Sequence, residues 1–340
     1  MRIFVGEFVS GGGLAEKDIH KIPASLRHEG AAMLRSIVSD LSEFASVTVP
    51  LDPRFDIEVD ATEIVPMRAN DSFYGQWVSA AENCDAALIV APESDGILAK
   101  SVAMLRAGGI DVVAGSGDFL RVASDKMQTA KCLLAAGVAH PLFVTVADDR
   151  YEQELQQFDR FVLKPRDGCG TQKIRTFDSY DEARAELTDN LILQPWMPGR
   201  AVSIALIASG TQLTLLPAVS QDLDRNTCEY AGGQGPLDGE SQRRAAVLAS
   251  RAIAAMPPTA RGFVGLDLLL GNYSSEDYVI EINSRLTTSY VGLRQIIHGN
   301  LAARLFELET GPVSCNAAVD SVRWTPSGTV WINDLVTEQA

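Results

Sequence analysis

Two carboxylates and one amide recur at a spacing that would bring them to one face of a β-sheet. Asp267 lies in an apolar segment, 263–270, and Glu281 and Asn283 lie in another, 278–283. If the segments pair as a hairpin, Asp267 stands opposite Glu281, and the alternation of side chains puts Asn283 on that face. Directly opposed acids repel, and apolar neighbours limit screening by water. A divalent cation resolves this conflict, and three oxygen ligands with room for phosphate and water suit Mg²⁺ or Mn²⁺.

The register of this hairpin is an inference from the sequence. It assumes that Leu270 pairs with Tyr278 and that residues 271–277 close the turn. The alternative is a polar sheet face on which Asp267 and Glu281 point into water.

A second group of residues could hold a phosphate. The predicted strand 161–164 ends in Lys164, and the loop after it contains Gly168, Gly170 and Thr171. An ammonium group and several backbone N–H groups can surround a phosphate in such a loop. The segment lacks the G-x-x-x-x-G-K-[ST] pattern of a Walker A loop. An ordinary surface turn is the alternative.

A third candidate is the lysine of Ser124-Asp125-Lys126, which opens a predicted helix ending at Ala136. Ser124 is a plausible N-cap for this helix. The positive end of a helix together with Lys126 could meet an anion. The alternative is a capped surface helix with no ligand.

The elements that must position these residues begin with a βαβ rhythm in the first 120 residues. The predicted strands are 2–8, 47–51, 64–67, 86–90 and 111–114, and the predicted helices are 23–44, 76–82 and 96–107. Alternating strands and helices of this kind predict a parallel sheet covered by helices, in an α/β fold.

The rest of the chain becomes richer in strands. The predicted helices are 124–136, 179–187, 240–255 and 290–306, and the predicted strands are 161–164, 191–194, 202–208, 213–219, 263–270 and 278–283, with a hairpin at 322–324 and 330–332. These changes predict three parts, 1–123, 124–195 and 196–340, and leave the role of 312–340 open.

Composition narrows the classes of partner. The 340 residues hold 29 Lys and Arg against 44 Asp and Glu, a formal charge of −15. Nucleic acids and anionic membranes are bound mainly through Lys and Arg, so we expect neither partner. No apolar run approaches the roughly 18 residues of a membrane span. The five cysteines form no C-x-x-C pair, so we expect a cytoplasmic protein without a disulfide scaffold. The sequence allows a homodimer without requiring one.

Taken in order, these residues resemble the ATP-grasp superfamily from about Ser124 to Phe306. The resemblance implies an ATP-grasp fold preceded by an N-terminal βαβ pre-ATP-grasp domain, with 124–195 as the lid subdomain and 196–340 as the central subdomain. Family lysines that contact the nucleotide phosphates match Lys126 and Lys164. The loop that folds over the phosphates matches the segment containing Gly168, Gly170 and Thr171.

The adenine-reading hinge of the family resembles Gln194-Pro195-Trp196-Met197, with the backbone of Trp196 and Met197 facing the base. Many members carry a glutamate two residues after the hinge glycine to hold the ribose. This chain has Ala201 there, so ribose recognition departs from the pattern, and Gln194 is a candidate substitute.

The metal ligands of the family match Asp267, Glu281 and Asn283. The form Glu281-Ile282-Asn283-Ser284-Arg285 is similar to that of members in which the arginine stabilises an acyl phosphate. A finer resemblance, to the branch that contains tyramine–glutamate ligase, rests on two short segments. Its substrate candidates are Ser10, Gly11, Gly12, Tyr230 and Gly232. The glycines at 11 and 12 are equally consistent with a tight turn.

The resemblance implies an ADP-forming ligase that uses ATP and Mg²⁺ or Mn²⁺ to join a small-molecule acid to an amine, in a pathway to a one-carbon cofactor such as methanofuran, methylofuran or tetrahydromethanopterin. The acid would attack the γ-phosphate, with Lys164 and Arg285 as catalytic residues. Two alternatives stay open: a carboxylase that uses bicarbonate, and a nucleotide-binding module without catalysis. Which acid and which amine react is not given by the sequence.

Overall fold

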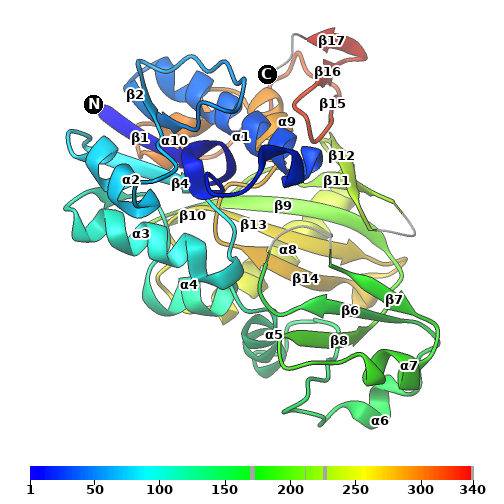
Figure 1. Ribbon diagram of the computed structural model, residues 1–340. Helices are drawn as coiled ribbons and strands as arrows, with labels where there is room; N and C mark the ends of the chain where they lie inside the picture. The colour runs from blue at the N-terminus through cyan, green and yellow to red at the C-terminus, as the bar shows by residue number, and fades with distance from the viewer. Residues whose placement is uncertain (169–172, 211, 225–227, 338–340) are drawn as a thin grey trace.

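Three β-sheets organise the chain. The structure, a computed structural model, describes residues 1–168, 173–210, 212–224 and 228–337. A five-stranded sheet lies at the left of Figure 1, a three-stranded sheet forms the lobe at the lower right, and a nine-stranded sheet lies between them.

The five-stranded sheet is parallel, with the order β3-β2-β1-β4-β5. Its strands are β1 (Arg2–Glu7), β2 (Ser46–Leu51), β3 (Glu63–Pro66), β4 (Ala86–Val90) and β5 (Asp111–Val112). Central strands of a parallel sheet are covered on both faces, which explains why β4 is entirely apolar and buried. The predicted parallel sheet is confirmed.

Helices cover both faces of this sheet. They are α1 (Ala24–Ser42), α2 (Phe73–Ala81), α3 (Ile97–Ala107) and α4 (Gly117–Ala123), with short turns at Val9–Gly13, Ile19–Lys21 and Ser94–Gly96. The apolar side of α1 packs in a core that also contains side chains of the nine-stranded sheet. A second core, built around the indole of Trp77 on α2, fills the opposite face.

The lobe at the lower right of Figure 1 contains the antiparallel sheet β7-β6-β8. Its elements are β6 (Phe161–Pro165), β7 (Arg175–Phe177), β8 (Leu191–Pro195), α6 (Glu152–Leu155) and α7 (Tyr180–Ala185). A small core of its own lies under this sheet and includes Phe161 and Leu163. The helix α5 (Lys126–Ala135) leads into the lobe.

The nine-stranded sheet follows the order β14-β13-β9-β11-β12-β15-β16-β17, with β10 paired to β9. Its strands are β9 (Arg200–Ser209), β10 (Gln212–Leu215), β11 (Val219–Leu223), β12 (Tyr230–Gly235), β13 (Gly262–Leu270), β14 (Tyr278–Asn283), β15 (Val322–Trp324), β16 (Val330–Ile332) and β17 (Leu335–Thr337). The helices are α8 (Gly239–Ala255), α9 (Tyr290–Ile296) and α10 (Leu301–Leu305), with a short turn at Ser274–Glu276. The predicted terminal hairpin is confirmed as β15 and β16.

Three local predictions are wrong. The helix predicted over 290–306 divides into α9 and α10, because Gly299 has a left-handed φ of 90° and Asn300 caps the second helix. The strand predicted over 213–219 divides into β10 and β11. Helix α5 is capped by Asp125 rather than Ser124, since the Asp125 carboxylate accepts from the N–H groups of the first turn.

Candidate active site

Asp267 and Glu281 are direct partners across β13 and β14, as the sequence predicts. The predicted pairing of Leu270 with Tyr278 is wrong, because Tyr278 pairs with Leu269. The register shifts between Asp267 and its neighbour Leu268, so β14 carries one extra residue between its two halves. Such a bulge increases the local twist of a strand next to a site, and here it shifts the pairing on the turn side of Asp267 by one residue.

Burial and repulsion shape the electrostatics of Asp267. Burial, and then the charge of Glu281, raise the pKa of Asp267 to about 6. Two amides oppose that rise: Gln221 Nε2 donates to Asp267 Oδ1 at 2.7 Å, and Asn283 Nδ2 donates to Asp267 Oδ2 at 3.1 Å. These two hydrogen bonds therefore stabilise the ionised form of the Asp267 carboxylate.

The donor set fits a divalent cation that prefers oxygen. The two carboxylates oppose one another, and because the nitrogen of Asn283 donates to Asp267, its amide oxygen would be the atom left to bind a cation. Mg²⁺ is commonly held by one or two carboxylates while substrate phosphates and water complete its shell. Within the described residues no cluster of three His, Cys, Asp or Glu side chains could hold a metal, so a cage made only of such groups is not present there.

Lys126, the first residue of α5, lies next to these carboxylates. Its Nζ lies 2.9 Å from Glu281 Oε1 and donates to the carbonyl of Gly168 at 2.8 Å. Arg166 fixes the start of the helix, because its guanidinium pairs with Asp125 at 2.5 Å and its carbonyl accepts from the Lys126 N–H at 2.7 Å. The two predicted phosphate-binding segments are thus held together.

Lys164 lies on β6 with only 6% of its surface exposed. Burial lowers the pKa of the Lys164 ammonium to about 8, the carboxylate of Glu281 opposes this, and the charge of Lys126 adds to it. Lys126 therefore contacts Glu281 directly, and the charges of Glu281 and Asp267 act on Lys164. Two cations at one end of an acidic pair can bind phosphate oxygens while a metal ion binds the acids.

The loop after β6 is described as far as Gly168, whose φ of 112° favours glycine. Asp167 Oδ2 accepts from the N–H of Asp95 at 3.0 Å, so the loop contacts the parallel-sheet unit. Gly170 and Thr171, predicted to contact phosphates, lie outside the described residues, and their role stays a prediction.

The predicted hinge follows the end of β8. Gln194 is 1% exposed and its Nε2 donates to the carbonyl of Pro141 at 3.1 Å. The Trp196 N–H donates to Arg160 O at 2.8 Å, and the Arg160 guanidinium lies over the indole of Trp196. Because the Trp196 N–H is engaged, an adenine contact there would use its carbonyl, together with the backbone of half-buried Met197.

Arg285 pairs with an acid that sequence reasoning missed. Its Nε donates to Glu93 Oε2 at 3.0 Å, and its Nη1 donates to the carbonyl of Leu286 at 3.1 Å. Glu93 lies three residues after the end of β4, and carboxyl ends of parallel strands are where binding residues gather. That position was the one available signal. No feature of the sequence pointed to Gln221, which donates to Asp267.

The glycine loop after β1 is packed into the protein. Ser10 donates through its hydroxyl to Glu7 Oε2 at 2.6 Å, and Trp77 Nε1 donates to the carbonyl of Gly11 at 2.8 Å. A Cβ on Gly12 would lie 3.0 Å from Met67. These contacts give Ser10, Gly11 and Gly12 a structural role, and substrate binding by them stays a prediction.

The second predicted substrate segment is the strand β12. The Tyr230 hydroxyl accepts from Trp324 Nε1 at 2.8 Å, and burial raises the pKa of Tyr230. Gly232 must lack a side chain, because a Cβ there would lie 2.1 Å from the carbonyl oxygen of Trp324. The charges of Glu29 and Asp267 also raise the pKa of Tyr230.

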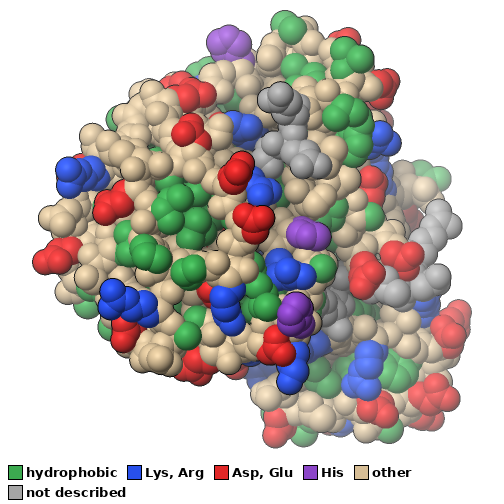
Figure 2. All heavy atoms as spheres, turned by 45° about the horizontal axis from the view of Figure 1, so that its top comes forward, with side chains coloured by type: hydrophobic (Ala, Val, Ile, Leu, Met, Phe, Trp, Pro, Cys, Tyr) green, Lys and Arg blue, Asp and Glu red, His purple; other side chains and the backbone are tan. Residues whose placement is uncertain are grey.

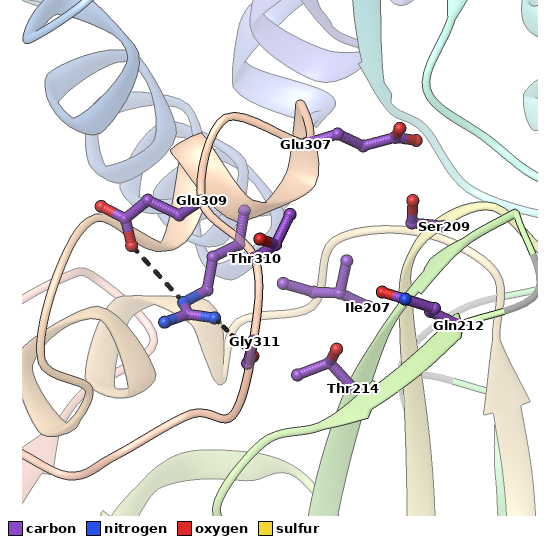
Figure 3. Close-up of a pocket in the computed structure, with 9 residues that line it drawn as sticks. Ile207, Ser209, Gln212, Thr214, Glu307, Glu309, Thr310 and Gly311 are labelled. Carbon is purple, nitrogen blue, oxygen red and sulfur yellow. Dashed lines mark hydrogen bonds and ion pairs between the residues drawn. The ribbon is translucent and has the colours of Figure 1, made fainter.

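The hollow in Figure 3 is separate from these residues. It lies between β10 and 307–311, has a volume of about 30 Å³, and contains the ion pair Arg304–Glu309 at 3.6 Å. That volume holds little more than water.

On the face shown in Figure 2, basic and acidic side chains are interspersed. Across the part of the chain that is described, no helix is both long and apolar enough to cross a bilayer.

Comparison with known families agrees with this geometry. Residues 123–289 match the ATP-grasp domain, and residues 45–118 match the pre ATP-grasp 3 domain. Tyramine–L-glutamate ligase of Methanocaldococcus jannaschii is 24% identical over 293 residues, covering 85% of this chain and 83% of that protein. The corresponding ligase of Methanocaldococcus fervens is also 24% identical, over 78% of this chain and 82% of its own length.

Solved structures show the same architecture. An ATP-grasp superfamily protein from Archaeoglobus fulgidus has a TM-score of 0.68 at 25% identity, covering 95% of this chain and 92% of that one. N5-carboxyaminoimidazole synthetase from Staphylococcus aureus, complexed with ADP, has a TM-score of 0.67 at 14% identity, covering 92% of this chain and 79% of that one, and supports the fold alone. The chain belongs to the ATP-grasp superfamily, as an ATP-dependent ligase whose pre-ATP-grasp domain precedes its ATP-grasp domain.

Proposed function

We propose that this ligase joins a carboxylic acid to an amine through an acyl phosphate, releasing ADP and phosphate. The observation that carries the proposal is the pairing of Asp267 with Glu281 beside Lys126 and Lys164. Phosphoryl transfer needs positioning and charge neutralisation rather than a covalent enzyme nucleophile. This arrangement supplies both.

Each residue has a proposed role. Asp267, Glu281 and Asn283 would hold Mg²⁺, which when bound neutralises charge on the transferring phosphoryl group. Lys126 and Lys164 bind phosphate oxygens and are aided by the loop that begins at Gly168. The remaining proposed contacts are with adenine, from Gln194, Trp196 and Met197, and with phosphate, from Gly170 and Thr171.

The proposed reaction has two steps. A carboxylate oxygen of the acid bonds to the γ-phosphorus as the bond to ADP breaks, giving an acyl phosphate. The amine nitrogen then bonds to the acyl carbon, phosphate leaves, and the amine gives up a proton. Arg285 would stabilise the negative charge on the transferring oxygens.

The named relatives suggest the substrate class. Both curated ligases act on tyramine and L-glutamate by name, so an amino-acid carboxylate and an aromatic amine are the first pair to test, and a step in cofactor biosynthesis is consistent with them. Phosphate release with MgATP should require both L-glutamate and tyramine, or another acid–amine pair from a panel. Turnover that depends on bicarbonate and needs no other carboxylic acid would instead indicate a carboxylase.

A further inference from the structure

The turn after β4 contacts two separate parts of the active site. Glu93 Oε2 accepts from Arg285 Nε, and two residues later the Asp95 N–H donates to Asp167 Oδ2, each at 3.0 Å. Arg285 follows β14 and Asp167 follows β6. One short turn of the parallel-sheet unit therefore reaches both the arginine and the phosphate-binding loop.

The Glu93–Arg285 ion pair is withdrawn from water. Only 4% of the Glu93 side chain and 12% of the Arg285 side chain are exposed. Glu93 Oε1 is buried and has no hydrogen-bond partner among the described residues. A buried carboxylate is costly unless it is paired, so Arg285 is the contact that compensates Glu93.

The charge of the Arg285 guanidinium also acts on two other carboxylates. Burial raises the pKa of both Glu7 and Glu29, and in each case the charge of Arg285 opposes that rise. An arginine side chain among several acids can point in more than one direction. The direct contact with Glu93, together with the bond to the Leu286 carbonyl, sets its direction here.

The turn itself adopts a special backbone. Asp95 has a φ of 54° and Gly96 a φ of 66°, both left-handed. A non-glycine residue is strained there, and strain of this kind persists only where surrounding contacts hold it. The bond from Asp95 to Asp167 is such a contact.

We propose that Glu93 is a positioning residue for the ligation. Its carboxylate holds the Arg285 guanidinium in the direction required beside the acyl phosphate, while Asp95 in the same turn anchors Asp167 next to Lys126. The inference rests on the proposed function, which gives Arg285 its role. It adds that the pre-ATP-grasp domain supplies a group on which catalysis depends.

The test is a double-mutant cycle of Glu93→Ala and Arg285→Ala, with Glu93→Gln as the conservative variant. Initial rates of hydroxamate formation are measured with MgATP, L-glutamate and hydroxylamine. The control is Asp111→Asn, which breaks the more exposed ion pair Asp111–Arg261, 2.7 Å, between the same two units.

Glu93→Ala should lower kcat by about 10- to 100-fold with little change in the KM for ATP, because misplacing one group costs that much. Glu93→Gln keeps an acceptor for Nε and should recover part of the rate. In the Arg285→Ala background, Glu93→Ala should lower kcat little further, because Glu93 acts through the Arg285 guanidinium, which is already absent. Asp111→Asn should leave kcat within about twofold of wild type.

Equal losses from Glu93→Ala with and without Arg285 would overturn the inference. So would an unchanged kcat with only a lower unfolding midpoint, which would show a purely structural ion pair. A wild-type enzyme that makes no hydroxamate from L-glutamate refutes the proposed substrate instead. In that case the cycle is measured by ADP release with the acid–amine pair that the panel identifies: non-additive losses of kcat support the inference, and additive losses overturn it.

Discussion

Lys126 and Glu281 form an ion pair, 2.9 Å between Nζ and Oε1, that joins the first residue of α5 to β14. Lys126 compensates the charge of Glu281. Asp267, which lies opposite Glu281 in the sheet, keeps a raised pKa. We expect MgATP to give each group a stronger partner, with the lysine turning to phosphate and the acids to the metal. The pair therefore keeps the charges of the site balanced before nucleotide binds.

Replacing Glu281 by Gln should lower kcat by about 100-fold or more, because charge stabilisation at the phosphoryl group is lost. The free energy of unfolding should change by no more than about 1 kcal/mol, since relief of repulsion with Asp267 and loss of the pair with Lys126 oppose one another. Rates and urea unfolding measure the two effects. Exposed Glu154→Gln on α6 is the matched control, and near wild-type activity of Glu281→Gln would refute the metal site.

A buried network should dominate the stability of the junction between α1 and α9. Asp40 is 5% exposed, accepts from the Tyr290 hydroxyl at 2.5 Å and pairs with Arg294. Asp40→Ala should lower the free energy of unfolding by about 3–5 kcal/mol, because it leaves a buried cation uncompensated. Asp118→Ala, which removes an exposed pair with Arg121, should cost less than about 1 kcal/mol. Equal losses of unfolding free energy from Asp40→Ala and Asp118→Ala, measured by urea unfolding, would contradict this prediction.

His140 should make the fold sensitive to acid. Its ring is 4% exposed and its Nδ1 lies 2.8 Å from the Pro141 carbonyl. Burial, and then the charge of Lys164, lower the pKa of His140 from its ordinary 6.5 to about 3. Between these values the unfolded chain binds a proton that the folded chain does not, so stability rises with pH and falls as pH drops from 6.5 toward 3.

His140→Gln should therefore reduce the loss of unfolding free energy between pH 7 and pH 5 by up to about 1.4 kcal/mol per pH unit below 6.5. The exposed His298→Gln serves as the control in the same denaturant titrations. An identical pH dependence of wild type and His140→Gln would show that His140 is not held neutral.

Local pattern predicts which acids lie at the centre of the site. The pairing of Asp267 with Glu281 follows from an assumed pairing of Leu270 with Tyr278 at the turn. Tyr278 instead pairs with Leu269, and the bulge in β14 offsets this difference of one residue, so Asp267 still lies opposite Glu281. The apolar segment Ala86–Val90 likewise predicts a central strand. These features depend on neighbours along the chain or on one adjacent strand.

What the sequence could not predict depends on contacts between distant segments. Glu93 and Arg285 are 192 positions apart, and no spacing rule connects them. The glycines after β1 are compatible with either a ligand or a tight turn until Trp77 is seen to fill the space beside them. Packing between segments far apart in the sequence, rather than local propensity, sets both arrangements.

Trapping the acyl phosphate is the most direct test of the proposed ligation. Wild-type protein, MgATP, a carboxylic acid such as L-glutamate and hydroxylamine should give a hydroxamate and one ADP per product, with no other amine present. Arg285→Ala should depress this reaction at saturating ATP and Mg²⁺. ADP formation that responds to bicarbonate alone, across a panel of carboxylic acids that yield no hydroxamate, would contradict the acyl-phosphate ligase.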